Sequence, residues 1–344
     1  MPAAPAPFDA VLLVSFGGPL GPEDIRPFLA NVLRGRRIPP ARIEEVAHHY
    51  ELFGGVSPIT AYTLEQAAGL RQQLARRGVP LPVYVGMRNW HPLLPDVLAR
   101  MAEDGVRRAI GVVSAAHRSY SSCTQYKQNV LQAREAVFAA GNRPVEVTYV
   151  GDWHLHDGFL TAVAQQVVAA RDTLPSALQE TARLVFTAHS VPATMTGAEN
   201  YRLQLQASAA EVARRLGVTN WALVYQSRSG RPEDPWLEPD VNDYLQAEHA
   251  RGGLAAVVLS PIGFVCDHIE VLYDLDHEAR ATCDAIGVTM ARASAVNAHP
   301  AFIAALADMV VNTWERYKRG RPITLVHPDA PNARELPPPI GSSR

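Results

Sequence analysis

The sequence predicts an α/β protein made of two Rossmann-like, doubly wound lobes, each built on a parallel sheet. Short apolar runs of strand length alternate with amphipathic stretches of helix length, and the same order of runs occurs in both halves of the chain. The length of 344 residues also exceeds that of one typical domain, which is ~100–150 residues. We therefore expect two lobes that face a shared crevice.

The first half contains three strand-like runs, and each ends at residues that favour a turn. The runs span residues 10–14, 81–86 and 108–114. The first is followed by the turn sequence SFGGP at residues 15–19. Residues 64–76 and 95–103 carry apolar side chains every three or four positions, which predicts helices between the strands.

The second half repeats this order. Its strand-like runs span residues 183–186, 221–225 and 254–259, and a helical pattern covers residues 203–216. Because the runs are apolar throughout, both faces of each sheet should be buried under helices, as in parallel sheets. Parallel neighbours need crossover connections, which are right-handed in nearly all proteins. The repeat predicts two lobes of similar topology.

The expected boundaries follow from these elements. The N-terminal lobe spans residues 8–160 and the C-terminal lobe residues 175–300, with a helix over 161–170 and a break at 171–176 between them. A closing amphipathic helix covers residues 301–319. Residues 320–344 are rich in proline and poor in apolar side chains, so we expect a disordered tail.

Composition argues against several classes of function. The 32 basic and 34 acidic residues give a formal net charge of −2, so no overall field attracts nucleic acid. No apolar run approaches the ~20 residues of a transmembrane helix, and the first residues lack the basic segment of a signal peptide. Three cysteines without CxxC spacing argue against a disulfide framework and predict a reducing, cytoplasmic location.

Two loops that follow predicted strands carry the candidate chemistry. His189 follows the run at 183–186, and His268 and Glu270 follow the run at 254–259. Loops at the carboxyl ends of parallel strands form the binding crevices of α/β proteins. Two imidazoles and a carboxylate can hold a borderline divalent metal or take up protons near neutral pH. The alternative is that His189 is a loop histidine with a purely structural role.

Three residues at strand ends of the first lobe should face this group across the crevice. They are Phe16, Arg88 and His117, and Arg228 joins the group on the second lobe. Isolated histidines elsewhere in the chain are more often caps or surface residues than ligands. We therefore exclude those from the candidate site.

Seven motifs in order along the chain then point to a family. They are SFGGP at 15–19, FGGVSPI at 53–59, GMRNWHP at 86–92, YSSCTQY at 120–126, FTAHSVP at 186–192, PWLEPDV at 235–241 and GFVCDHIEVLYD at 263–274. With these motifs the chain resembles the ferrochelatases, which insert ferrous iron into a porphyrin in haem biosynthesis. The resemblance runs from about Ala10 to about Tyr317. It implies a chelatase-like pair of lobes with a porphyrin between them.

Within the family, the chain looks most like the bacterial, actinobacterial-like branch whose members act on coproporphyrin III. The features are Ser57 in the glycine-rich turn, Asn89 where many relatives have tyrosine, and QSRSG at 226–230. The arginine-rich and proline-rich segment 34–42 favours a substrate with four propionates and a monomeric enzyme. Protoporphyrin IX remains the alternative substrate. A non-catalytic porphyrin or haem carrier and a chelatase for another metal, such as cobalt, also remain open.

The resemblance assigns roles to single residues. The family's metal positions fall on His189 and Glu270, and the porphyrin contacts of the bacterial branch fall on Ser57 and Tyr126. Phe16 stands where well-known members have a tyrosine or a methionine on the opposite face of the macrocycle. A phenylalanine ring has no donor atom, so it cannot ligate iron. Ser57 could instead be a helix cap, and Tyr126 a core aromatic.

Inserting Fe²⁺ into a free porphyrin must remove two pyrrole protons, and neutral imidazole and carboxylate side chains suit that task. We expect His268 to orient Glu270 or extend the proton path, and Asp267 to fix a histidine tautomer. Residues expected to grip the macrocycle, by apolar contact or by pairing with propionates, are Trp90, Phe264, Met87, Arg34, Arg36, Arg37 and Arg88. The alternative for the arginines at residues 34–37 is a solvated basic turn that does not contact the substrate.

The cofactor and partner predictions complete this view. Some ferrochelatases hold a [2Fe–2S] cluster on one interior cysteine and several near the C-terminus. Cys123 lies in a comparable loop, but no cysteine follows Cys283 and a cluster needs four ligands. We therefore expect no cluster and no tightly bound cofactor, with Fe²⁺ and a porphyrin as substrates. Transient contacts with other enzymes of the haem pathway are also expected.

Overall fold

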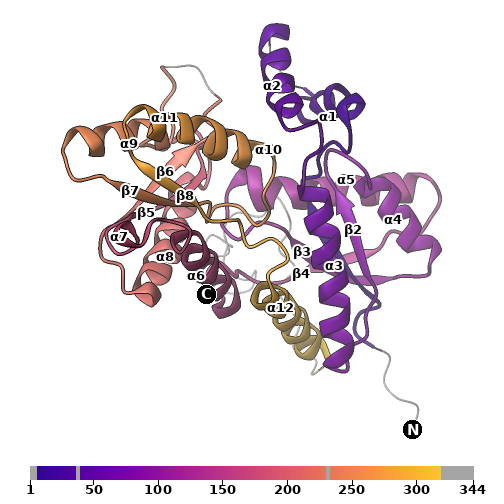
Figure 1. The fold of residues 1–344 in the computed structure, drawn as a ribbon. Helices are drawn as coiled ribbons and strands as arrows, with labels where there is room; N and C mark the ends of the chain where they lie inside the picture. Colours follow the sequence, from indigo (N-terminus) through magenta and orange to yellow (C-terminus); the bar gives the residue numbers. More distant parts are fainter. Residues whose placement is uncertain (1–5, 36–38, 230–232, 319–344) are drawn as a thin grey trace, which may run out of the picture.

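The computed structural model describes residues 6–35, 39–229 and 233–318. These residues form two four-stranded sheets, one in each half of the chain, with helices packed around them (Figure 1). All neighbouring strands pair in parallel. The strand orders, β2-β1-β3-β4 and β6-β5-β7-β8, give both sheets the same topology. The predicted α/β class with two doubly wound lobes is confirmed.

The first sheet is built from apolar strands that are covered on both faces. Its strands are β1 (Ala10–Ser15), β2 (Val83–Met87), β3 (Arg108–Val113) and β4 (Glu146–Tyr149). Along β1, Val11 and Leu13 pack into one core while Leu12 and Val14 pack into another. Successive side chains of a strand point to opposite faces, which explains why the whole run is apolar.

Helices of the first half lie on both sides of this sheet and also extend beyond it. They are the 3₁₀ turn η1 (Pro22–Asp24), α1 (Ile25–Val32), α2 (Pro40–Leu52), α3 (Ile59–Arg76), α4 (Leu94–Glu103), the π-helical turn η2 (Tyr120–Thr124) and α5 (Gln125–Ala139). α3 packs on one face of the sheet, and α4 and α5 pack on the other. α1 and α2 project from this lobe at the top of Figure 1.

The second half repeats the arrangement. Its strands are β5 (Arg183–His189), β6 (Trp221–Gln226), β7 (Ala256–Ser260) and β8 (Thr289–Arg292). Its helices are α6 (Asp157–Arg171), α7 (Ser176–Gln179), α8 (Ala198–Leu216), α9 (Val241–Ala250), α10 (Ile269–Val271), the π-helix η3 (Leu272–Ala279), α11 (Arg280–Ala285) and α12 (Pro300–Lys318). No helix of the described residues is both long and apolar enough to span a membrane.

Each sheet has a fourth strand that the apolar runs did not reveal. β4 and β8 are four residues long and lie at a sheet edge. Short edge strands that contain polar residues carry little hydrophobic signal. α6, which we expected at the boundary between the lobes, packs against α8, β7 and β8 of the second lobe. The lobe boundaries themselves stay a prediction.

α12 joins the two lobes. It packs against α3 and β3 of the first lobe and against α6 on the other side, below both sheets in Figure 1. A single apolar core runs through this region and contains Leu13 of β1, Phe186 of β5 and Leu306 of α12. The two lobes are therefore fastened together on one side. The tail predicted at 320–344 lies outside the described residues.

The strand order defines where each sheet can bind a ligand. In the second sheet, the chain passes from β5 to β6 on one side and then to β7 on the other. Open α/β sheets bind ligands at this kind of switch point, outside the carboxyl ends of the two central strands. His189 is the last residue of β5, and the loop with His268 and Glu270 follows β7.

Candidate active site

A glycine allows the two candidate loops to meet. Gly263, in the loop after β7, crosses the end of β5 so closely that an added Cβ would lie 2.5 Å from the Cβ of Ala188. Its N–H donates to the carbonyl of Thr187 at 3.1 Å. No side chain fits at such a separation, and glycine permits close backbone approach. The crossing brings the loop of Glu270 to the end of the strand that carries His189.

The ring of His189 is oriented by its own backbone. Nδ1 forms a short hydrogen bond with the carbonyl oxygen of Ser190, and the phenol of Tyr201 donates to the carbonyl oxygen of His189 at 3.2 Å. Because a carbonyl can only accept, Nδ1 must carry the proton. In the neutral imidazole Nε2 then keeps a lone pair, which can bind a metal or take up a proton.

That lone pair faces Glu270. Nε2 of His189 lies 3.7 Å from Oε2 of Glu270, and the two side chains are 36% and 46% exposed. The separation is too long for a good hydrogen bond. It is shorter than the sum of two metal–ligand bonds of about 2.1 Å each, so one ion can contact both atoms. The predicted convergence of these residues is borne out by the geometry, and their exposure lets a solvent ion reach them.

His268 contributes at the start of α10. Its Nδ1 accepts the backbone N–H of Val271 at 3.2 Å, so His268 is the N-cap of the short helix that contains Glu270. Burial lowers the pKa of His268. Phe264 packs edge-on against this ring at a centroid distance of 5.0 Å. The hydrogen bond from Val271 to His268 is consistent with the expectation that His268 orients Glu270.

Asp267 has a different role from the one expected. Its carboxylate binds the guanidinium of Arg292 and the amide of Asn297, at 2.8 and 2.7 Å. Its N–H donates to Oδ1 of Asn297 at 2.8 Å. These partners are a half-buried arginine and a buried asparagine of the scaffold, so the prediction that Asp267 fixes a histidine tautomer is wrong. Arg292 also binds Asp276 of η3, so it holds the chain on both sides of Glu270.

Asp274 is a member of the site that the sequence reasoning did not single out. It follows Glu270 by four residues, and because a π-helix bonds i to i+5, residues four apart lie near one face. Asp274 accepts from the amide of Gln226 at 3.2 Å and, by a shorter bond, from the hydroxyl of Ser227. Burial raises the pKa of Asp274 to about 7. Glu278, exposed and four residues further along, continues the row.

Three predicted residues of the first lobe come together. The guanidinium of Arg88 lies 4.6 Å from the ring centroid of Tyr126 and 5.6 Å from that of Phe16. Its Nε donates to Asn129 at 2.7 Å. Tyr126 is 7% exposed, and burial raises the pKa of its phenol. The group combines a cation with two aromatic rings, a surface suited to a large anionic ring system.

Other predicted contacts are less accessible. Ser57 is 4% exposed and lies directly under Gly18. It does not cap α3, because the N-cap is Pro58 and no side chain bonds the first turn. Met87 is completely buried, so the prediction that it grips the macrocycle is wrong. Trp90 is half-buried, and its indole N–H donates to Asp24 at 3.0 Å.

His117 also departs from expectation. It is 2% exposed, and its Nε2 is hydrogen-bonded to Ser208 of α8 at 3.0 Å. Burial lowers the pKa of His117 to about 3. It therefore faces the second lobe as a packed residue and not across an open crevice. Arg34 is exposed and bonds Asn31, while Arg36 and Arg37 lie outside the described residues.

A contact between the lobes lies beside the site. The ring of His49 on α2 stacks on Tyr273 of η3, with centroids 3.5 Å apart and an interplanar angle of 9°. Ile269, next to Glu270, packs into the core of α1 and α2 together with Phe28 and Tyr50. α1 and α2 of the first lobe thus reach the helix that carries Glu270.

The comparisons with known proteins agree with this architecture. A family model described as Ferrochelatase matches residues 8–314. A ferrochelatase of Rhodopirellula baltica is 45% identical over 304 residues, covering 88% of this chain and 86% of the relative. A coproporphyrin III ferrochelatase of Mycolicibacterium smegmatis is 45% identical over 306 residues (88% and 89%), and one of Streptomyces griseus is 43% identical over 334 residues (93% and 88%).

Solved structures match in fold. The sirohydrochlorin chelatase SirB from Bacillus subtilis subspecies spizizenii, in complex with cobalt, superposes with a TM-score of 0.53 at 12% identity. SirB from Bacillus subtilis with Fe³⁺ gives a TM-score of 0.55 at 13% identity. Each match covers 90% of this chain and 97% of the other. At such low identity the likeness concerns the fold alone.

Proposed function

The chain belongs to the ferrochelatase family, and from that membership we propose that it inserts Fe²⁺ into coproporphyrin III in haem biosynthesis, with release of two protons. It is a metal chelatase of the lyase class. Several of its relatives are named for coproporphyrin III, which supports that substrate. The observation that carries the proposal is the arrangement of His189 and Glu270 at the switch point of the second sheet.

The pair provides what metal insertion requires. The Nε2 lone pair of His189 and the Glu270 carboxylate can each bind Fe²⁺ or accept a pyrrole proton, but neither does both at once. Two protein donors leave coordination positions for water and for pyrrole nitrogens. We propose that the pair receives the ion, hands it to the macrocycle and takes up the displaced protons.

Protons then leave along the row of acids on η3. Asp274, with a pKa of about 7, can exchange a proton with its surroundings at neutral pH, which an ordinary aspartate rarely does. Its hydrogen bonds to Gln226 and Ser227 hold it on the face below Glu270. Glu278 is exposed and marks the exit to solvent. This route uses no side chain of the first lobe.

The first lobe supplies the opposite surface. We propose that the macrocycle lies with one face toward His189 and the other toward Phe16, with Arg88 and Tyr126 near its propionates. An arginine can bind a carboxylate bidentately. Ser57, Trp90 and Phe264 stay predicted porphyrin contacts. Because Phe16 offers no donor atom, iron is held from the His189 side only.

An anaerobic assay with both porphyrins tests the proposal. Fe²⁺ insertion into coproporphyrin III and protoporphyrin IX is followed separately by the loss of free-base fluorescence. We expect a higher kcat/KM for coproporphyrin III. A preference for protoporphyrin IX would overturn the substrate assignment. Equal binding of the free base and the iron complex without insertion would instead identify a carrier.

Further proposals concern cofactors, assembly and location. Three cysteines in the sequence cannot supply the four ligands of an all-cysteine [2Fe–2S] cluster, so we propose that none is bound. A charge-transfer spectrum with stoichiometric sulfide, lost in Cys123→Ser, would contradict this. We also propose a monomer with transient contacts to other haem-pathway enzymes. The three free thiols support a reducing, cytoplasmic location.

A further inference from the structure

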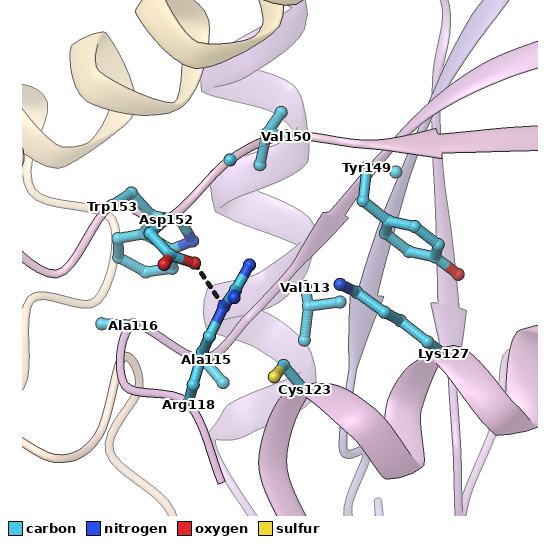
Figure 2. Close-up of a pocket in the computed structure, with 12 residues that line it drawn as sticks. Val113, Ala115, Ala116, Arg118, Cys123, Lys127, Tyr149, Val150, Asp152 and Trp153 are labelled. Carbon is cyan, nitrogen blue, oxygen red and sulfur yellow. Dashed lines mark ion pairs between the residues drawn. The ribbon is translucent and has the colours of Figure 1, made fainter. Parts of the chain in front are cut away.

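A pocket with a thiol and an ammonium group lies outside the site described above. It is small and partly open to solvent, and it is formed where β3 and β4 end against η2 and α5. Cys123, Lys127, Arg118, Asp152 and Tyr149 contribute its reactive, charged and aromatic side chains. Figure 2 shows Cys123 between Arg118 and Lys127. No step of iron insertion uses these groups.

The two cations of the pocket have different neighbours. Arg118 forms a close ion pair with Asp152, drawn as a dashed line in Figure 2, so that these two charges compensate each other. Lys127 instead lies over the ring of Tyr149, with Nζ 4.9 Å from the ring centroid. Burial lowers the pKa of Lys127, and attraction to a Cys123 thiolate opposes that shift. An incoming carboxylate would therefore find its partner at Lys127.

Cys123 differs from the other two cysteines of the chain. It is half-buried, lies in the π-helical turn η2 and faces the pocket, with Sγ 3.8 Å from the carbonyl of Ser119. Cys266 and Cys283 are 3% and 0% exposed. Burial raises the pKa of their thiols to about 12 and about 11. Thiols of that kind are inert, whereas an accessible thiol beside a lysine is a nucleophile.

We propose that Cys123 and Lys127 form a thiol-modification site for small disulfides that bear a carboxylate. Lys127 binds the carboxylate and stabilises the negative charge that develops on sulfur. The sulfur of Cys123 attacks one sulfur of the disulfide. A new S–S bond forms to Cys123, the original S–S bond breaks, and the second half leaves as a thiolate while the proton of Cys123 passes to solvent.

The location links this site to iron insertion. η2 runs directly into α5, and Tyr126 lies in the first turn of α5 with its ring under Arg88. An adduct on Cys123 fills the pocket at the base of that turn. We infer that it displaces Tyr126 and Arg88 from the porphyrin surface, so that oxidation of small thiols lowers turnover reversibly.

Two probes of the same chemistry test the site on the full chain. Dithiobis(nitrobenzoate) carries a carboxylate on each half, and dithiodipyridine is neutral. With the first probe we expect one rapid adduct per folded chain, at Cys123 by peptide mass mapping, and reaction of Cys266 and Cys283 only after unfolding. Adducts on those two residues in the folded protein, or none at Cys123, would overturn the proposal. This readout does not depend on the proposed enzymatic activity.

Matched variants isolate the role of the ammonium group. Lys127→Met should slow the carboxylate probe at least about threefold more than the neutral probe. Arg143→Met removes an exposed cation of the same lobe and should change neither rate. Equal slowing of both probes in Lys127→Met would contradict the carboxylate preference. Circular dichroism of each variant shows whether the fold is kept.

The rate of iron insertion tests the proposed link between the Cys123 adduct and Tyr126. The wild-type adduct should lose at least about half of its insertion rate and regain it with dithiothreitol, and Cys123→Ser should be insensitive to the probe. An adduct at Cys123 that leaves the insertion rate unchanged would overturn the link to Tyr126. A loss of rate in Cys123→Ser on exposure to the probe would overturn the assignment to this thiol.

Discussion

Nε2 of His189 lies 3.7 Å from a carboxylate oxygen of Glu270, although His189 ends strand β5 and Glu270 lies in α10, 81 residues further along the chain. The contact follows from topology, because β5 and β7 are adjacent and parallel and present their carboxyl ends at the same edge. It also depends on Gly263, whose lack of a side chain lets the second loop cross the first strand. The two residues that we propose as metal ligands and proton acceptors thus meet at one point.

Replacing the carboxylate should stop proton transfer and keep the shape. We expect Glu270→Gln to slow single-turnover Fe²⁺ insertion at least tenfold, a change of ~1.4 kcal/mol in the barrier. Glu103→Gln, an exposed change on α4, serves as the control. An unchanged rate with altered metal preference would make Glu270 a selectivity residue and not a proton acceptor.

Asp274 should make stability depend on pH. Burial raises its pKa from 3.8 to about 7, so the folded protein retains a proton that the unfolded chain releases near pH 4. The stability contributed by this proton is complete below about pH 4 and is lost as the pH rises through about 7. The melting temperature of the wild type should therefore fall across this range relative to Asp274→Asn. Parallel curves for the two proteins would refute the shift.

Arg292 should be essential for the loop that carries Glu270. Its side chain is 13% exposed and binds Asp267 and Asp276. Arg292→Met removes the cation that pairs with both carboxylates, and removing one member of a buried ion pair costs about 3–5 kcal/mol. Arg100→Met breaks an exposed pair with Asp104, where the arginine is 69% exposed, and should leave the free energy of unfolding nearly unchanged because solvent screens such pairs. Free energies of unfolding in urea compare the two, and similar losses would contradict the account.

Phe16→Tyr should alter the product complex more than the insertion step. The new phenol supplies an oxygen that can bind ferric product on the face opposite His189. We expect a shifted haem-type spectrum and slower product release, with single-turnover insertion nearly unchanged. A change of about tenfold in insertion without a spectral shift would mean that iron enters from the Phe16 side.

Much of this architecture could be predicted from local sequence. Apolar runs such as residues 183–186 are strands because a parallel sheet buries both of its faces. The positions of His189 and Glu270 after two such runs predicted that they would lie close together. The partners of Asp267 could not be predicted, because Arg292 and Asn297 reach it only through the folded chain. His117 also follows a strand and was therefore predicted to face the crevice, but α8 of the other lobe covers it.

The sequence carries only part of the signal for Asp274. Acidic residues recur at every fourth position from Glu270 through Glu278. Their side chains lie on one face only if the segment is helical. The segment is a π-helix, which has no recognised sequence signal. The raised pKa of Asp274 depends on burial against β6, which local sequence does not encode. The approach of His189 to Glu270 was therefore predictable from the sequence, whereas the burial of Asp274, on which the proposed proton route depends, was not.

The most direct test of the His189 and Glu270 pair is single-turnover insertion of Fe²⁺ into coproporphyrin III by His189→Ala under anaerobic conditions. The side chain is 36% exposed and adds little to the core, so fold and porphyrin affinity should be nearly unchanged. We predict that the variant keeps less than about a tenth of the wild-type rate, a loss above ~1.4 kcal/mol. A variant that binds porphyrin normally and retains more than that fraction would contradict the assignment of metal delivery and proton uptake to this pair.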